Sequence, residues 1–237
     1  MAEPAPGRST SIDATNPSWP KWRPSDPTSA HWYQPKHLGR LIAGYVAHDE
    51  DADRDRTVRE FVAEFRGLSG TAKQKKVLEA TGLGRASLSG LRNGTGLDAG
   101  LVANLLIAMQ EQSRPVKPAQ LGVIGETHLR KRFVAAGCEM QSFDYKRVVG
   151  CTDGIPWVIE TAFGWCPDAS HRRLVTGVNW SPGIINPFRV LGRFGASLDT
   201  ILSQQRADAN EPVILVLHMA CPRVEYLDRG KSAVVVG

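Results

Sequence analysis

The sequence contains no apolar run of membrane-spanning length and no signal-peptide core. A helix that crosses a bilayer needs about 20 consecutive apolar residues, and the residues after Met1 are small, polar and proline-bearing, unlike a secretion signal. No C-x-x-C pair occurs either, so neither a zinc ribbon nor a redox dithiol is expected. The four cysteines are predicted to be reduced, mostly buried thiols of a cytoplasmic protein. They are Cys138, Cys151, Cys166 and Cys221.

Motifs for catalysis are also lacking. There is no phosphate-binding G-x-x-x-x-G-K-[ST] loop, no nucleophile elbow or triad order, and no metal-ligand spacing among the histidines. Asp144 and Glu160, on adjacent candidate strands, could form an acid pair, but carboxylates on strands are more often solvated or ion-paired. His218 lies inside an apolar run and is interpreted as a hydrogen-bonded core histidine. We therefore predict no catalytic residue, no metal site and no cofactor bound by this chain alone.

The composition is that of an ordinary globular protein. Apolar residues make up 42% and charged residues 22% of the 237 residues, close to the average for soluble domains. A chain of this length forms one large domain or two small ones. The net charge of +5 permits contact with nucleic acid without requiring it.

Changes in periodicity divide the chain into three parts. Residues 1–33 are predicted to be a disordered tail followed by a linker rich in proline and aromatics, in which residues 18–33 should be pinned to the chain's own body or to a neighbouring domain. Residues 34–137 carry helical periodicity. Residues 138–237 carry the pattern of strands, with one helix capped by Ser197. The sequence therefore predicts an α+β protein with a helical domain followed by a small α/β domain.

The helical part contains a possible DNA-binding element. Residues 71–93 read as a helix, a glycine turn and a second short helix, the pattern of a helix-turn-helix. Basic side chains surround it and could neutralise several phosphates. These candidate DNA-binding residues are Lys73, Lys75, Lys76, Arg85 and Arg92. The alternative is a solvated basic helix face, because no amide or aromatic side chain is clearly placed to read bases.

The strand-like part is organised around its last quarter. Residues 213–219 form an almost unbroken apolar run, typical of a strand buried on both faces. The preceding strands and helix outline a β-α-β crossover, which should be right-handed. After the run, Gly230 sits in a polar turn that delivers Lys231 to the end of a second short strand. Such a lysine can direct its ammonium group at a phosphate held by another surface; the alternative is a solvated turn lysine.

Four stretches, in this order, resemble one protein family. They are QSRPVKPAQLGVIGETHL (residues 112–129), PWVIETAFGW (156–165), RRLVTGVNWSP (172–182) and PVILVLHMACPRVEYLDRGKSAV (212–234). They are similar to the "IGE" passage, the "E-x-A-x-A-Y-G" strand, the "R-x-A-N-R-V-P" strand and the "G-K-x-A-I" switch loop of the ATPase subunit of DNA topoisomerase VI. The resemblance is to the bacterial-type relatives, spans about residues 38–236 and covers the helix-two-turn-helix and transducer regions.

This resemblance implies a mechanism for the last quarter of the chain. In the family, a GHKL ATPase domain dimerises on ATP and Mg²⁺, and the transducer relays the closure to a DNA-cleaving A subunit. By this resemblance Lys231 is the switch-loop lysine that senses the terminal phosphate, and Gly230 gives its backbone the freedom to approach. The implied partners are a GHKL ATPase domain or chain, an A-like subunit, duplex DNA and a second copy of the chain, in the cytoplasm and at the nucleoid.

The sequence departs from the family in what surrounds these motifs. The magnesium helix, adenine loop and lid loops of a GHKL domain are not found, so ATP and Mg²⁺ are expected in a partner, and the transducer is expected to be truncated at its C-terminus. Two alternatives stay open. One is a helix-turn-helix DNA-binding regulator whose sheet domain senses a ligand or dimerises, and the other is a truncated remnant without function.

Overall fold

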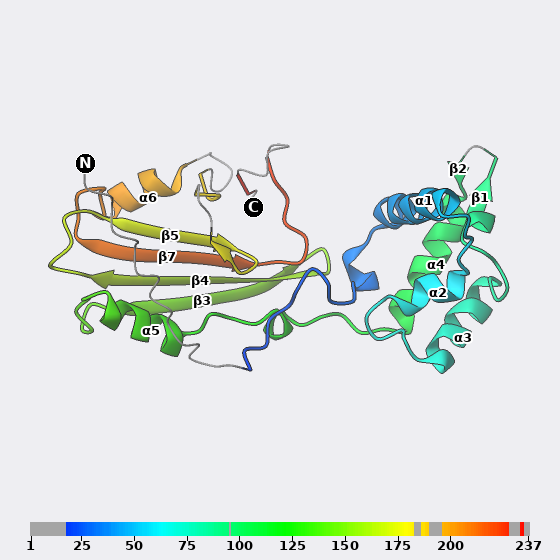
Figure 1. The fold of residues 1–237 in the computed structure, drawn as a ribbon, viewed down its shortest axis with the longest axis horizontal. Coiled ribbons are helices and arrows are strands. Elements are labelled where there is room, and N and C mark those ends of the chain that lie inside the picture. Colours follow the sequence, from blue (N-terminus) through cyan, green and yellow to red (C-terminus); the bar gives the residue numbers. More distant parts are fainter. Residues whose placement is uncertain (1–17, 95, 183–185, 190–195, 228–232, 235–237) are drawn as a thin grey trace, which may run out of the picture.

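The computed structural model describes residues 18–94, 96–182, 186–189, 196–227 and 233–234, and it is a mixed α+β protein (Figure 1). Its α-helices are α1 (Pro35–Asp51), α2 (Val58–Ala63), α3 (Thr71–Thr81), α4 (Ala99–Glu111), α5 (Glu126–Ala135) and α6 (Leu198–Gln204). Short 3-10 helices are η1 (Ala30–Trp32), η2 (Ser89–Leu91) and η3 (Pro118–Gln120). The strands are β1 (Arg92–Asn93), β2 (Gly96–Leu97), β3 (Asp144–Thr152), β4 (Ile155–Trp165), β5 (Arg173–Val178), β6 (Ser181–Pro182) and β7 (Val213–Ala220). Within these residues, no helix is long and apolar enough to cross a membrane.

Helices α1 to α4 gather at one end of the molecule and form the helical region, residues 30–111 (Figure 1). Their apolar faces meet in one core that includes Ile42, Phe61, Leu78 and Leu105. Helix α2 begins with a capping box, because the Thr57 side chain accepts from the Glu60 N–H and the Glu60 carboxylate accepts from the Thr57 N–H.

The other end of the molecule is a five-stranded sheet in the order β3-β4-β7-β5-β6. Strand β7 is parallel to β5 and antiparallel to β4, so the apolar run of residues 213–219 lies in the middle of the sheet, as predicted. Helix α6 lies in sequence between β5 and β7 and begins at the predicted cap, Ser197, whose side chain accepts from the Thr200 N–H.

Helices α5 and α6 pack on opposite faces of this sheet. Side chains of successive strand residues point to opposite faces, so Ala162 packs with the α5 residue Phe133, whereas the next residue, Phe163, packs with the α6 residue Leu202. Helix α5 lies inside the range 34–137 predicted to be the helical domain, but its core is that of the sheet. The packing boundary therefore precedes residue 137.

The second helix predicted within residues 85–93 is wrong. Only the 3-10 turn η2 forms there, and the two-stranded hairpin β1–β2 follows it. The reason is a set of competing partners: the Leu88 N–H donates to the Arg56 carbonyl, and the Asp55 carboxylate accepts from the N–H and hydroxyl of Ser89. Bonds of this kind satisfy backbone groups outside a helix. The second short strand expected after the apolar run is also not formed among the described residues, where residues 224–227 make only a single bridge, between Tyr226 and Val234.

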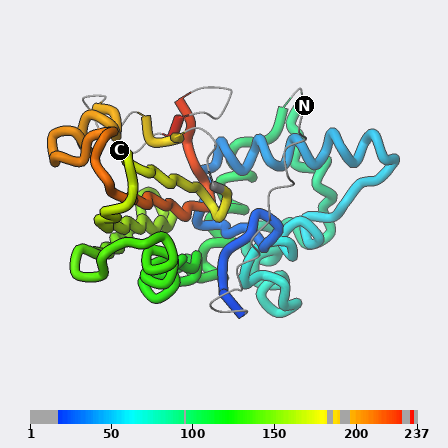
Figure 2. Tube along the Cα trace, turned by 60° about the vertical axis from the view of Figure 1, so that its left-hand side comes forward, coloured from blue at the N-terminus to red at the C-terminus, as the bar shows by residue number. Residues whose placement is uncertain are grey.

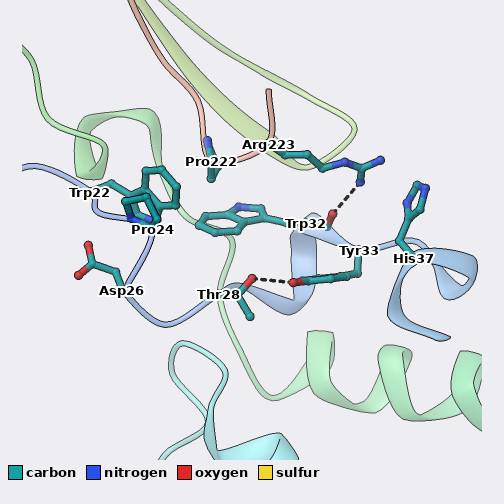
Figure 3. A pocket seen from close by; sticks show the side chains of 9 residues that line it. All are labelled: Trp22, Pro24, Asp26, Thr28, Trp32, Tyr33, His37, Pro222 and Arg223. Carbon is teal, nitrogen blue, oxygen red and sulfur yellow. Dashed lines mark hydrogen bonds between the residues drawn. The ribbon is translucent and has the colours of Figure 1, made fainter. Parts of the chain in front are cut away.

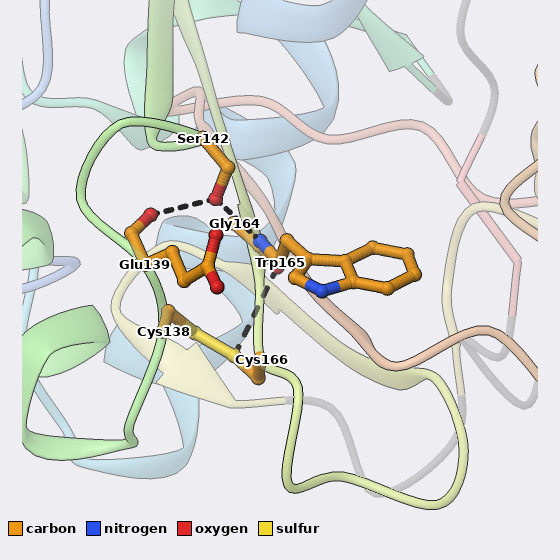
Figure 4. The surroundings of a disulfide bond; sticks show 6 residues. All are labelled: Cys138, Glu139, Ser142, Gly164, Trp165 and Cys166. Atoms are coloured by element: carbon orange, nitrogen blue, oxygen red, sulfur yellow. Dashed lines mark hydrogen bonds between the residues drawn. A yellow bond between two sulfur atoms is a disulfide. The ribbon is translucent and has the colours of Figure 1, made fainter.

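The prediction of four reduced cysteines is wrong for two of them. Cys138 and Cys166 form a disulfide that joins the chain after α5 to the end of β4 (Figure 4). Around it, the Ser142 hydroxyl donates to the Glu139 carbonyl at 2.6 Å and accepts from the Trp165 N–H at 2.8 Å. Since the two cysteines lie 28 residues apart, only the folded chain brings them together.

Candidate functional site

A buried glutamate lies where β4 crosses the middle of the sheet. Glu160 is fully buried, and its two carboxylate oxygens accept four hydrogen bonds. The donors are the Ile124 N–H (2.8 Å), the Gly125 N–H (2.8 Å), the Tyr145 hydroxyl (2.8 Å) and, at 3.0 Å, His218 Nδ1. Burial removes the carboxylate oxygens from water, and each oxygen instead accepts two hydrogen bonds from the protein. Such partners are the condition for burying a carboxylate.

These donors set the charge of the carboxylate. Desolvation by burial alone would raise the pKa of Glu160, but the hydrogen bonds from His218, from the backbone at Gly125 and Ile124, and from Tyr145 outweigh it, so the net pKa is lowered. Glu160 is therefore an anion that fastens the chain before α5 to the sheet. Because it is fully buried, it is an anchor and does not meet a substrate.

The residues around Glu160 come from all four stretches that carry the family resemblance. Gly125 belongs to the first stretch, Glu160 to the second, Trp180 to the third and His218 to the fourth. The rings of Trp180 and His218 lie 4.6 Å apart between centroids. Asn179, beside Trp180, donates to the Cys221 carbonyl and accepts from the Cys221 N–H, which joins the third stretch to the fourth. We call Gly125, Tyr145, Glu160, Trp180 and His218 the anchor cluster.

The interpretation of His218 as a hydrogen-bonded core histidine is confirmed for Nδ1, whereas its Nε2 is buried with no hydrogen-bond partner among the described residues. Asp144 and Glu160 do not form an acid pair, the alternative that was not favoured. Asp144 pairs in register with Phe163 and is exposed, while Glu160 is opposite Arg147.

The predicted switch residues Gly230 and Lys231 lie outside the described residues. The residues on either side of them are described and meet: the Leu227 N–H donates to the Ala233 carbonyl at 2.9 Å, and Tyr226 and Val234 form an antiparallel bridge. The Val234 N–H in turn donates to the Pro187 carbonyl at 2.8 Å. Residues 226–227 and 233–234 therefore lie together, and Tyr226 and Val234 belong to the core on one face of the sheet.

The five predicted DNA-binding residues are all exposed, but they differ in their partners. Lys75 pairs with Glu79 at 3.7 Å and Arg92 with Glu50 at 2.5 Å. The Lys73 ammonium donates to the Gly67 carbonyl at 2.8 Å. On α3 the buried positions Gln74, Val77 and Leu78 define the inner face, so Lys73 and Lys75 flank that face on opposite sides and Lys76 points away from it. The helix thus exposes positive charge around most of its circumference without a single flat basic face.

The linker rich in aromatics packs on the chain's own body, which decides between the two alternatives left open for it. The Trp19 indole donates to the Val123 carbonyl, and the Trp22 N–H donates to the Leu121 carbonyl. Toward the helical region, the Arg66 N–H donates to the Thr28 carbonyl at 2.7 Å. Figures 1 and 2 show this aromatic segment (residues 18–33), in dark blue, running between the helices and the sheet.

Sequence reasoning missed two parts of the site. Tyr145 and Trp180 were not recognised as members of a cluster, because the pairing of β3 with β4 and of Trp180 with His218 comes from the tertiary fold. A cavity beside the aromatic segment was also missed, although four aromatic residues within residues 18–33 were the signal for it. No group of three or more His, Cys, Asp or Glu side chains that could hold a metal ion occurs in the part of the chain that the structure describes.

Neither a scan against protein-family models nor a search of the curated proteins returns a match for this chain.

Proposed function

We propose that this chain is the transducer portion of a B-like subunit of a type IIB DNA topoisomerase, topoisomerase VI. In this role it couples the nucleotide state of a GHKL ATPase domain to DNA handling by a cleaving subunit. The helical region corresponds to the helix-two-turn-helix domain and the sheet, with its crossover through α6, to the transducer domain.

The anchor cluster is the observation that carries this proposal. The four stretches that resemble the family lie far apart in the sequence, and their motif residues meet around one buried carboxylate. Chance similarities in four separate stretches have no reason to converge in space, whereas the shared core of a domain does. The buried glutamate also links the backbone ahead of α5 to β4 and β7, which suits a part that transmits movement as a rigid body.

The described residues on either side of Lys231 support its assignment as the nucleotide-sensing residue. Lys231 follows β7 in the sequence with ten residues between them, and Leu227 and Ala233, which flank residues 228–232, are joined by a hydrogen bond. Contact with the terminal phosphate would favour the nucleotide-bound arrangement and would be lost after hydrolysis, so Lys231 would bias a two-state domain movement.

The regulator alternative receives less support from the geometry. A helix-turn-helix protein reads bases with its second helix, and residues 89–97 instead form the turn η2 and the hairpin β1–β2. The exposed lysines around α3 suit weak contact with duplex phosphates that does not depend on sequence.

The substitution Lys231→Ala tests the coupling role. Added to a GHKL ATPase partner, the native chain should stimulate ATP turnover, and the variant should lose that stimulation by about tenfold or more, the effect of losing one charge-assisted contact to phosphate. Steady-state phosphate release measures both. Lys131→Ala removes an exposed lysine on α5 and should leave stimulation unchanged. Equal stimulation by the native chain and by Lys231→Ala would rule out the switch role.

The mass of the native polypeptide decides in which molecule that assay is done. An immunoblot of the source cells with an antibody against this chain gives a band either near 25.9 kDa or much heavier. A heavier band places Lys231 in the same polypeptide as the ATPase domain, and the substitution then belongs there. A band near 25.9 kDa means that the ATPase is a separate chain to be added in the assay.

A further inference from the structure

Strand β3 is the outer strand at one end of the five-stranded sheet (Figure 1). Within the described residues, no strand pairs with its outer edge, and the strand is nine residues long. A long open edge is a template for pairing with another strand. The strand at the opposite end of the sheet, β6, has only two residues. The β3 edge is therefore the place where the sheet can be extended.

The turn between β3 and β4 fixes which backbone groups of β3 point outward. Thr152 and Ile155 flank the two-residue turn and pair with each other, so they exchange hydrogen bonds, and every second pair along the ladder does the same. The Thr161 hydroxyl accordingly donates to the Lys146 carbonyl, which points toward β4. The alternate residues direct their N–H and C=O groups away from β4. These outward residues are Tyr145, Arg147, Val149 and Cys151.

Apolar side chains are exposed on both faces of this edge. Val148 is 43% and Val149 is 51% exposed, and as successive strand residues they point to opposite faces of the sheet. On the face of Val148, the Trp157 ring of β4 lies over Gly150, where an added Cβ would be 2.2 Å from the ring. The indole thus occupies the place of the missing side chain and presents an apolar surface at β3.

Charges limit how a second copy of β3 can pair with this edge. Antiparallel strands place outward residues opposite outward residues, and an axis at Arg147 would set the two guanidinium groups opposite each other. An axis at Val148 would make them diagonal neighbours, still close enough to repel. With the axis at Val149, Arg147 lies opposite the partner's Cys151. Its diagonal neighbour is then the partner's Asp153, whose charge has the opposite sign. An axis nearer the turn would leave fewer residues paired.

We propose that two copies of this chain associate by pairing their β3 strands antiparallel about a twofold axis at Val149, which joins the two sheets into one. Across the axis, Arg147, Val149 and Cys151 exchange roughly six backbone hydrogen bonds with the same residues of the second copy. Val149 meets its own counterpart on one face, and Val148 meets the partner's Gly150 and the indole over it on the other. The same surface serves both copies, as a twofold interface requires. This interface does not depend on the coupling function proposed above.

Sedimentation velocity of the full chain tests the association. A strand edge is smaller than the roughly 1,600 Å² of a standard interface, so we expect a weak monomer–dimer equilibrium with a Kd on the order of 10–100 µM. A chain that stays monomeric up to about 500 µM would overturn the proposal. The variant Cys151→Ser should associate equally, because the backbone makes the contact. A dimer that is lost with this exposed thiol would be a disulfide product and not a paired edge.

The variant Val149→Pro separates this edge from every other surface. The Val149 N–H points outward, so proline removes hydrogen bonds of the dimer and leaves the ladder between β3 and β4 intact. It should weaken association by about tenfold or more. Val149→Thr keeps the N–H and the branched shape and should associate within about threefold of the native chain. Circular dichroism reports the fold of each variant, and full association of a folded Val149→Pro variant would place the interface elsewhere.

Pulsed electron paramagnetic resonance measures the register independently of any loss of binding. The spin label is attached at Asp144→Cys in the Cys151→Ser variant, in which the remaining free cysteine is buried. With the axis at Val149, residue 144 lies opposite the partner's Gly154, so the labelled positions are separated along the strands by about ten residues, or about 34 Å. An axis at Val148 would give about 27 Å. That shorter distance would contradict the register, and the absence of any defined distance in the dimer would contradict strand pairing.

Discussion

At the scale of single residues, Glu160 ties the sheet region to the segment before α5. Its carboxylate is the shared acceptor for donors from η3–α5, β3 and β7. Tyr145 is affected in turn: desolvation first, and then the hydrogen bond to Glu160, raise the pKa of its hydroxyl. Tyr145 therefore stays a neutral donor throughout the physiological range, and the cluster keeps one negative charge.

Replacing Glu160 with glutamine tests this anchor. The amide keeps the shape but turns an N–H₂ group toward donors, so the free energy of unfolding at neutral pH should fall by about 2–4 kcal/mol. Urea denaturation followed by circular dichroism measures it. Glu111→Gln, at an exposed position on α4, should change the free energy of unfolding by less than about 0.5 kcal/mol. A loss at Glu160 no larger than that would contradict the anchor role.

The same pair of proteins has a defined pH dependence. Because the folded-state pKa of Glu160 lies below its ordinary value of 4.5, its contribution to stability is fully present above about pH 4.5 and is lost as pH falls through the folded pKa. The stability difference between the native chain and Glu160→Gln should therefore be constant from pH 7 to about pH 5 and shrink at lower pH. A difference that grows on acidification would mean that the folded pKa is raised.

At the scale of elements, the aromatic segment is held by close backbone contact with a tight turn. Asp153 and Gly154, with φ of 50° and 79°, form the two-residue turn between β3 and β4, the left-handed geometry typical of short hairpins. A Cβ atom on Gly154 would lie 2.5 Å from the His31 carbonyl oxygen. Glycine is thus required there both by its φ and by the approach of the aromatic segment.

The variant Gly154→Ala should displace the aromatic segment. We expect a loss of about 1–3 kcal/mol from the left-handed strain and the overlap together, with a change in tryptophan fluorescence as Trp32 moves. Gly137→Ala is the matched control, because Gly137 has φ of 81° but open space around the added Cβ. If both variants lose the same stability, the strain alone explains the effect and the contact with His31 contributes nothing.

At the scale of the whole molecule, the net charge of +5 alone gives some attraction to DNA, so the α3 cluster must be distinguished from charge in general. Replacing Lys73, Lys75 and Lys76 together with glutamine should weaken duplex binding and reduce the slope of log affinity against log salt by about 1–2, because the three lysines do not share one face and cannot all contact one duplex. Fluorescence anisotropy with a duplex at several salt concentrations measures the slope.

A second triple variant provides the control for charge. Lys117, Lys131 and Lys146 are exposed and lie outside the helical region, and their replacement by glutamine removes the same total charge. The slope should then change by less than about 0.5. Equal changes in the two triple variants would place the attraction in the charge of the molecule as a whole and not on α3.

The arrangement of the whole molecule also explains where the cavity lies. The aromatic segment runs between the helical region and the sheet (Figures 1 and 2). The cavity is lined by residues of this segment, of α1 and of the chain after β7 (Figure 3). The cavity therefore lies at the junction of the two regions.

Periodicity along the chain determined the class of the fold. Helical periodicity over residues 34–137 predicted the helices of that part of the chain, and the apolar run at residues 213–219 predicted the strand β7, because local spacing decides which face of an element is apolar. The helix cap at Ser197 could also be predicted from neighbouring residues alone. The same reasoning failed at residues 85–93, where Asp55 and Arg56, more than thirty residues away, bind the backbone and override a helical pattern.

The sequence by itself therefore determined the elements, the alternation of faces and the four motif stretches, since each depends on residues close together in the chain. Only the tertiary structure decided that those stretches meet at Glu160, that Cys138 joins Cys166, and that Trp22 and Trp32 line one cavity. The two cysteines are 28 positions apart. The other contacts depend on which strands pair and on how the helices pack against the sheet. The spacing of residues along the chain does not predict such contacts, because they form only when strand pairing and helix packing bring distant residues together.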